Sequence, residues 1–159
     1  MPRRSPFTHR NLPLLLLQAR EAVMQHRRPS LREHGLSDQQ WRVLRVLAEH
    51  ADAGGLDTGS VAQQAFILGP SLTGMLARME RDGLVTRQRS DEDARRSVVS
   101  ATAAGLALAD ALSQAIEADY LDLEAHLGKT KLAQLYRLLD ELIALQEEAC
   151  TEEPLETMA

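Results

Sequence analysis

Cysteine, aromatic residues and long apolar runs are all scarce in this chain of 159 residues. Cys150 is the only cysteine, so it excludes an internal disulfide and a cysteine-based metal site. Its acidic neighbours disfavour the thiolate that a redox role would need. Aromatic residues make up 3% of the chain, and no apolar run reaches the roughly 18 residues that a membrane span needs. The five histidines form no ligand pair. We therefore expect a cytoplasmic protein without metal or cofactor.

The net charge of −5 is distributed unevenly along the chain. Residues 1–34 carry seven arginines against two acids, and residues 70–102 carry six arginines against five acids. Residues 103–159 carry three basic residues against twelve acids. A nucleic-acid duplex would be attracted to the first two segments and repelled by the third.

The apolar periodicity predicts a mainly α-helical chain with a small β-ribbon. It favours a helix over residues 11–27, a break or bend at Arg28–Pro29–Ser30, and a short helical stretch over residues 31–34 that Gly35 ends. Ser37 with Gln40 forms a capping box for the following helix, whose expected inward face is Trp41, Leu44, Leu47 and Ala48. The later elements are predicted at residues 58–65, 70–82, 85–89, 97–101, 103–127 and 129–149.

The helix that Pro70 begins has two different faces. Leu72, Met75, Leu76 and Met79 follow the spacing of a buried side. The other side is small, polar and basic, which would let the helix approach the base edges of a major groove. An ordinary amphipathic surface helix is the alternative. The candidate DNA contacts of this helix are Ser71, Thr73, Gly74, Arg78 and Arg81.

The loop between the two strands is strongly charged. Three acids at its tip would repel phosphate, so we expect Asp93 to fix the loop through backbone amides or a nearby arginine. Arg95 or Arg96 would then be free to enter a minor groove. A solvated hairpin loop with self-compensating charges is the alternative. Arg87, on the first strand, completes the candidate DNA contacts.

Three motifs carry a resemblance to the MarR family of bacterial transcriptional regulators over about residues 8–148. They are LSDQQWRVLRVLAE at Leu36–Glu49, PSLTGMLARMERDGLV at Pro70–Val85, and Asp93-Ala94-Arg95, with Thr102 leading the following helix. Together with the second motif, LLQAREAVM at Leu16–Met24 is similar to the homoprotocatechuate-degradation repressor group. Ala101 departs from the leucine usual before that threonine, which would loosen the packing at the base of the ribbon.

The resemblance implies a winged helix-turn-helix domain over residues 35–102 and a helical dimerisation region made of residues 1–34 and 103–149, followed by a disordered acidic tail over residues 150–159. It implies a homodimer that binds double-stranded, pseudo-palindromic operator DNA and represses transcription. It also implies release of the DNA when a small aromatic acid binds between the two regions.

Arg20 is the strongest candidate for binding that acid, because it lies within an apolar stripe. An effector carboxylate or an ion pair with a C-terminal acid across the dimer would satisfy it equally well. Trp41 and Arg45 lie four residues apart on the next helix, so they share a face and are further candidates. A place in the hydrophobic core is the simpler interpretation of Trp41. His9 and Arg10 are weaker candidates. The subgroup resemblance favours a hydroxyphenylacetate or homoprotocatechuate effector, and 6-hydroxynicotinate is the alternative.

Two other functions compete with a DNA-binding repressor. One is a helical interaction protein whose ribbon binds protein rather than DNA. The other is an enzyme, which the sequence disfavours because it has no nucleophile–base pair, metal set or phosphate-binding glycine loop.

Overall fold

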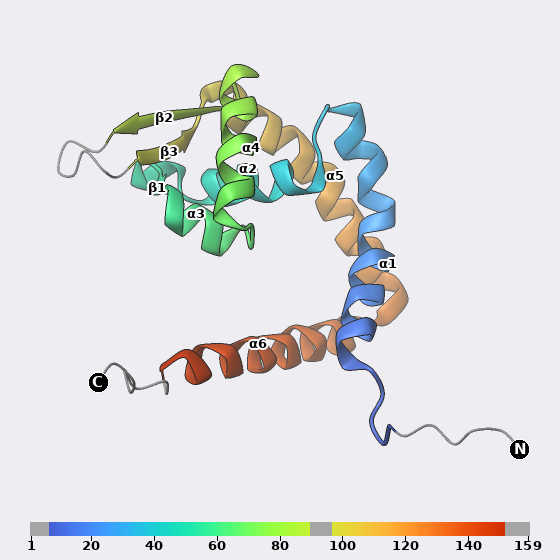
Figure 1. Ribbon diagram of the computed structural model, residues 1–159. Helices are drawn as coiled ribbons and strands as arrows, with labels where there is room; N and C mark the ends of the chain where they lie inside the picture. The colour runs from blue at the N-terminus through green and yellow to red at the C-terminus, as the bar shows by residue number, and fades with distance from the viewer. Residues whose placement is uncertain (1–6, 90–96, 152–159) are drawn as a thin grey trace, which may run out of the picture. The chain divides into compact units, whose positions relative to one another are not determined.

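The computed structural model describes the backbone of residues 7–89 and 97–151, and the side chains of residues 7–88 and 97–145. Within these ranges the chain forms helices α1 to α6, one 3₁₀ turn (Ala51–Ala53) and strands β1 to β3 (Figure 1). The chain divides into two compact units: the first ends at Ile116 and the second begins at Glu117. The fold class is confirmed: the protein is mainly α-helical with a small antiparallel sheet. No helix of the described ranges is apolar over enough length to cross a membrane.

Helix α1 runs without interruption from Leu12 to Glu33. Of the predicted break or bend at Arg28–Pro29–Ser30, the break is wrong, because Pro29 lies inside the helix. Proline removes one helical hydrogen bond, but Leu31 beyond it is only 2% exposed. Burial of that side chain outweighs the local preference to end the helix. Gly35, at φ +71°, follows the end of the helix as predicted.

Helices α2 (Asp38–Glu49), α3 (Thr58–Gln64) and α4 (Gly69–Arg81) form the middle of the first unit. The predicted capping box of α2 is confirmed: the Gln40 N–H donates to Ser37 Oγ at 3.2 Å, and the Ser37 N–H donates to Gln40 Oε1 at 2.9 Å. Asp57 caps α3 by accepting the Ser60 N–H at 3.1 Å.

The two predicted strands pair with each other and with a third. Strand β2 (Val85–Arg89) lies antiparallel to β3 (Ser97–Ala101), and Val85 is opposite Ala101. Strand β1 (Leu56–Asp57) lies on the other side of β3, giving the order β1-β3-β2. Sequence analysis missed β1, because two residues are too few to show an alternating pattern.

The core of the first unit is aliphatic and lies where helices α1 to α4 meet the sheet and the start of α5 (Ala103–Leu127). The side chains that are less than 2% exposed are Leu31, Val43, Leu44, Leu47, Val61, Leu72, Leu76, Met79, Val85, Val99 and Leu112. The backbone of helix α5 packs closely against Leu84 at Gly105. A Cβ on Gly105 would lie only 2.1 Å from the Leu84 carbonyl oxygen. The Thr102 hydroxyl fixes this packing by accepting the Gly105 N–H at 3.0 Å.

The second unit contains the end of α5 and helix α6 (Lys129–Thr151), separated by Gly128 at φ +93°. Leu132 is 6% exposed, but most of the other large apolar side chains described on α6 face solvent. These are Leu135, Tyr136, Leu138, Leu142, Ile143 and Leu145. In the first unit, α1 has a comparable exposed set, made of Leu12, Leu14, Leu16 and Leu17.

Candidate nucleic-acid interface

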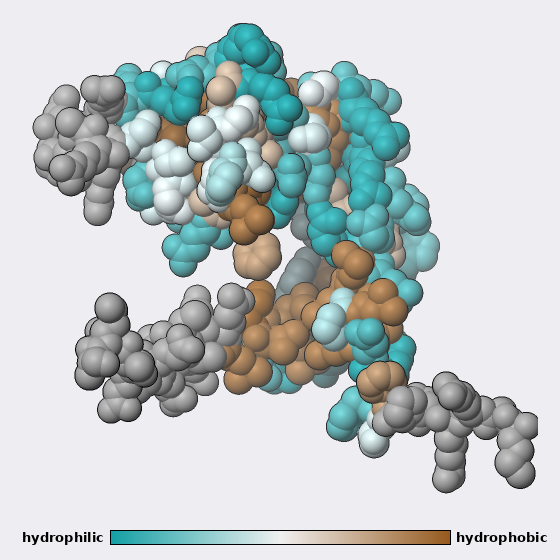
Figure 2. Space-filling model, viewed as in Figure 1, coloured by the Kyte–Doolittle hydropathy of each residue, from teal (hydrophilic) through white to brown (hydrophobic). Residues whose placement is uncertain are grey.

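Helix α4 presents a face of small, polar and basic side chains. Its five candidate DNA contacts, Ser71, Thr73, Gly74, Arg78 and Arg81, are all exposed. A Cβ on Gly74 would meet no other atom within 4 Å, so nothing inside the protein requires glycine there. Figure 2 shows this face as pale and teal surface over α4.

The opposite face of α4 is anchored in the core. Leu72, Met75, Leu76 and Met79 are at most 2% exposed, as the sequence predicted. This burial fixes the rotation of the helix about its axis, and therefore which side chains it presents.

Glu80 joins the end of α4 to strand β2. Its carboxylate accepts two hydrogen bonds from the Arg87 guanidinium, at 2.9 Å from Nε and 2.5 Å from a terminal nitrogen. It also accepts the Arg87 backbone N–H at 3.2 Å. The hydrogen bond from the Arg87 side chain holds the pKa of Glu80 below its ordinary value. Arg87, a candidate DNA contact, thus already has a partner within the chain, and its role at DNA stays a prediction.

The ribbon formed by β2 and β3, hereafter the wing, is tied to the rest of the first unit at its base. The Thr58 hydroxyl donates to the Ser97 carbonyl at 3.2 Å, and the Ser100 hydroxyl donates to the Gly54 carbonyl at 2.8 Å. The candidate tip residues Asp93, Arg95 and Arg96 lie outside the described residues, as does the tail from residue 152 onward.

Arg20 is exposed and pairs with two acids of its own chain. It donates to Glu21 at 3.0 Å and to Asp38 in the first turn of α2. Arg28 donates to the other oxygen of Glu21 at 2.6 Å, and this hydrogen bond lowers the pKa of Glu21. The ion pair with a C-terminal acid across the dimer involves a second copy of the chain and stays a prediction. Sequence analysis missed Asp38, because no spacing links residues on two different helices.

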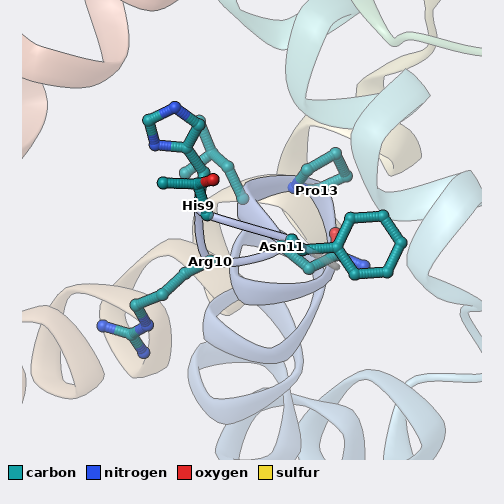
Figure 3. A pocket seen from close by; sticks show the side chains of 7 residues that line it. His9, Arg10, Asn11 and Pro13 are labelled. Carbon is teal, nitrogen blue, oxygen red and sulfur yellow. The ribbon is translucent and has the colours of Figure 1, made fainter. Parts of the chain in front are cut away.

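The other candidate effector residues do not share one environment. Trp41 is 7% exposed and belongs to the core, whereas Arg45 is exposed and donates to Glu49 at 2.9 Å. His9 and Arg10 lie in a hollow lined by residues 7–13 before and at the start of α1. Their side chains point in different directions (Figure 3). The structure therefore joins Arg20 to the first turn of α2, the helix that carries Trp41 and Arg45, whereas His9 and Arg10 lie before the start of α1.

Helices α3 and α4 pack against each other, α4 has an exposed polar face, and an antiparallel wing follows it. These features define a winged helix-turn-helix protein. Comparison with known proteins gives the family: a model of the MarR family matches residues 34–96. The homoprotocatechuate degradative operon repressor of Escherichia coli is 46% identical over 137 residues, which are 86% of this chain and 90% of the relative. The regulator FarR of Neisseria gonorrhoeae is 40% identical over 139 residues, covering 87% and 93% of the two chains.

A solved structure gives the same result. The crystal structure of NadR in complex with 4-hydroxyphenylacetate is 42% identical and has a TM-score of 0.77, with 89% of this chain and 97% of that chain covered. The chain belongs to the MarR family of DNA-binding transcriptional regulators, which is a family of non-enzymatic proteins.

Proposed function

We propose that this protein binds a pseudo-palindromic operator as a homodimer in the cytoplasm, and that a small aromatic acid releases it. The regulated genes are those of an aromatic-compound degradation operon of the hydroxyphenylacetate or homoprotocatechuate type. The observation that carries the DNA-binding part is the divided surface of α4, with four apolar residues fixed in the core and five small, polar or basic residues exposed. Such a helix can approach base edges without losing its own packing.

The dimer is supported by the apolar side chains that α1 and α6 leave exposed. Leu17 on α1 is 55% exposed and Ile143 on α6 is 60% exposed, and each belongs to a set of apolar side chains on its helix. Sets of this kind are typical of surfaces that bury themselves against another chain. Two copies of one α4 would then read two half-sites related by the same two-fold symmetry.

The effector proposal rests on the relatives and on Arg20. NadR is described in complex with 4-hydroxyphenylacetate, and the Escherichia coli relative is a repressor of a homoprotocatechuate degradative operon. In this chain the guanidinium of Arg20 is exposed and donates to carboxylates, so it can donate hydrogen bonds to the carboxylate of an aromatic acid. 6-Hydroxynicotinate has the same acid and hydroxyl groups and remains the second candidate.

Arg20 also offers a route from effector to DNA. Its bond to Asp38 joins α1 to the first turn of α2, which contacts α3 and the sheet. An effector that draws Arg20 away from Asp38 would alter this joint, and with it the spacing of the two α4 helices. The effector must favour one spacing over the other, and a coupling of about 1–3 kcal/mol is typical.

The DNA-binding proposal is tested with a duplex selected from a random library by the wild-type protein. Affinity is measured over a salt series for the wild type, Arg78→Ala and a control, Arg137→Ala on α6. We expect Arg78→Ala to lose about 1–3 kcal/mol of sequence discrimination if Arg78 contacts a base, and Arg137→Ala to match the wild type. Counterion release should make the wild-type affinity fall steeply with salt. A flat salt dependence would instead favour the helical interaction protein, and equal binding by all three proteins would remove Arg78 from the interface.

A further inference from the structure

Two large apolar side chains are exposed in the turn between α3 and α4. Phe66 is 80% exposed and Leu68 is 79% exposed, whereas Ile67 between them is 8% exposed. Among the described residues from 35 to 116, these two are the only large hydrophobic side chains that are exposed. Single exposed hydrophobic residues are ordinary. The backbone conformation at these two positions therefore has to show whether the pair is functional.

Phe66 occupies a backbone position that suits glycine. Its φ is +53°, and every other residue with positive φ in the described ranges is a glycine. The Phe66 N–H donates to the Gln63 carbonyl at 3.1 Å, and the Ile67 N–H donates to the Ala62 carbonyl at 2.9 Å. These are the two bonds of a Schellman motif, in which glycine is preferred at the position of Phe66. A phenylalanine there makes the turn less stable than glycine would.

Leu68 occupies a position that suits a short polar residue. It is the N-cap of α4 and makes no side-chain capping bond. The chain uses Ser37 and Asp57 at the N-caps of α2 and α3, where both side chains accept a backbone N–H. A leucine at an N-cap is less favourable than serine or aspartate.

Arg42 holds this turn in one conformation. One terminal nitrogen of its guanidinium donates to the carbonyl oxygens of Ala65 at 2.9 Å and Phe66 at 3.1 Å. The two exposed side chains are thus carried on a fixed turn, at two positions, one residue apart on either side of Ile67, where the local preference is broken. Broken local preferences that the fold nevertheless maintains are expected at functional positions.

We propose that Phe66 and Leu68 contact thymine methyl groups of the operator, and so add an apolar element to the sequence specificity of the protein. This inference rests on the proposed binding of α4 to DNA. Leu68 directly precedes the first turn of α4, and Figure 2 shows brown surface beside the pale face of that helix, at the end where it begins. Thymine presents its methyl group in the major groove, where apolar side chains recognise it. The exposed leucines that suit a second copy of the chain belong to other helices, α1 and α6.

The test compares Phe66→Gly, Leu68→Ser and Leu68→Ala with the wild type on a duplex selected by the wild-type protein. Each thymine is replaced in turn by deoxyuridine, which removes only the methyl group. Phe66→Gly and Leu68→Ser should raise the melting temperature, because each restores the locally preferred residue. All three variants should nevertheless bind the thymine duplex more weakly. A loss of about fourfold is expected for each buried methyl group, which is worth ~0.8 kcal/mol.

Deoxyuridine at the position that Leu68 contacts should weaken the wild type by the same factor and leave Leu68→Ala unaffected. Leu68→Ala separates loss of the apolar contact from capping of the α4 N–H groups, which only serine can provide. Variants that bind the thymine duplex as tightly as the wild type, or that lose affinity equally on both duplexes, would overturn the inference. A changed oligomeric state in sedimentation would assign the pair to a chain–chain contact and also overturn it. Arg78→Ala on the same duplexes tests α4 separately, so failure of the apolar contact and failure of the interface are distinguishable.

Discussion

Glu80, in the last turn of α4, accepts three hydrogen bonds from Arg87 on β2, two from its guanidinium and one from its backbone N–H. The two residues are joined across the tight turn that contains Gly83, at φ +73°. The orientation of the proposed groove-binding helix is thereby linked to the first strand of the wing. Arg87 therefore has a structural role within the protein, because it holds Glu80, and any contact that it makes with DNA would be additional.

Glu80→Gln should destabilise the protein in a pH-dependent way. The bond from Arg87 lowers the folded-state pKa of Glu80, so its stabilisation is present above the unfolded pKa of about 4.3 and is lost as the pH falls through the folded value. Thermal unfolding should give a lower melting temperature for the variant at pH 7 and converging values below about pH 4. In an Arg87→Met background the same substitution should have a much smaller effect. A difference between wild type and variant that is constant across this range would contradict the assigned ion pair.

Gly105→Ala should be strongly destabilising. The added Cβ would lie 2.1 Å from the Leu84 carbonyl oxygen and 3.3 Å from a Leu44 methyl carbon. The backbone at Leu84 cannot move away without disturbing its bond from the Thr102 N–H, at 3.0 Å. We expect a loss of about 1–3 kcal/mol, typical of overpacking a filled core, measured by urea unfolding. An unchanged unfolding midpoint would show that α5 does not enter the core as closely as described.

Gly74→Ala should affect stability and DNA binding in opposite directions. The new methyl group meets no protein atom within 4 Å, and alanine favours a helix interior by about 1 kcal/mol over glycine. The unfolding free energy should therefore rise, which also makes this variant a control for Gly105→Ala. Operator affinity should fall, because a methyl group on the presented face keeps α4 farther from the bases. A variant that is more stable and binds equally well would show that this face does not approach DNA closely.

Local signals made most of the fold predictable from sequence. The capping box at Ser37 and Gln40, the glycines that follow helices, and the four apolar positions of α4 all act over a few residues, and the structure contains each of them. Features decided by packing were not predictable. Burial of Leu31 carries α1 through Pro29, and β1 forms only because β3 is there to pair with it.

The candidate site was predictable to a similar extent. The exposed face of α4 follows from helical periodicity alone, and it is present in the structure. The pairs Glu80–Arg87 and Arg20–Asp38 join residues of different elements, so neither could be read from spacing. The positive φ of Phe66 also had no sequence signal, because the residue most typical of that conformation is glycine.

Arg20→Ala should uncouple the effector from DNA release. Arg20 pairs with Asp38 and Glu21, and no candidate DNA contact is removed. The variant lacks the joint to Asp38, so it should bind the selected duplex more weakly than the wild type. It should also need at least tenfold more 4-hydroxyphenylacetate for release, since a lost charged hydrogen bond is worth about 1.5–3 kcal/mol. Asp38→Asn separates the two roles of the joint, because it keeps Arg20 available to the effector while weakening the bond that the effector must replace. It should therefore release DNA at a lower effector concentration than the wild type, as followed by fluorescence anisotropy. Release of the Arg20→Ala variant at the wild-type concentration would remove Arg20 as the effector anchor, and the same titration with 6-hydroxynicotinate decides between the two candidate effectors.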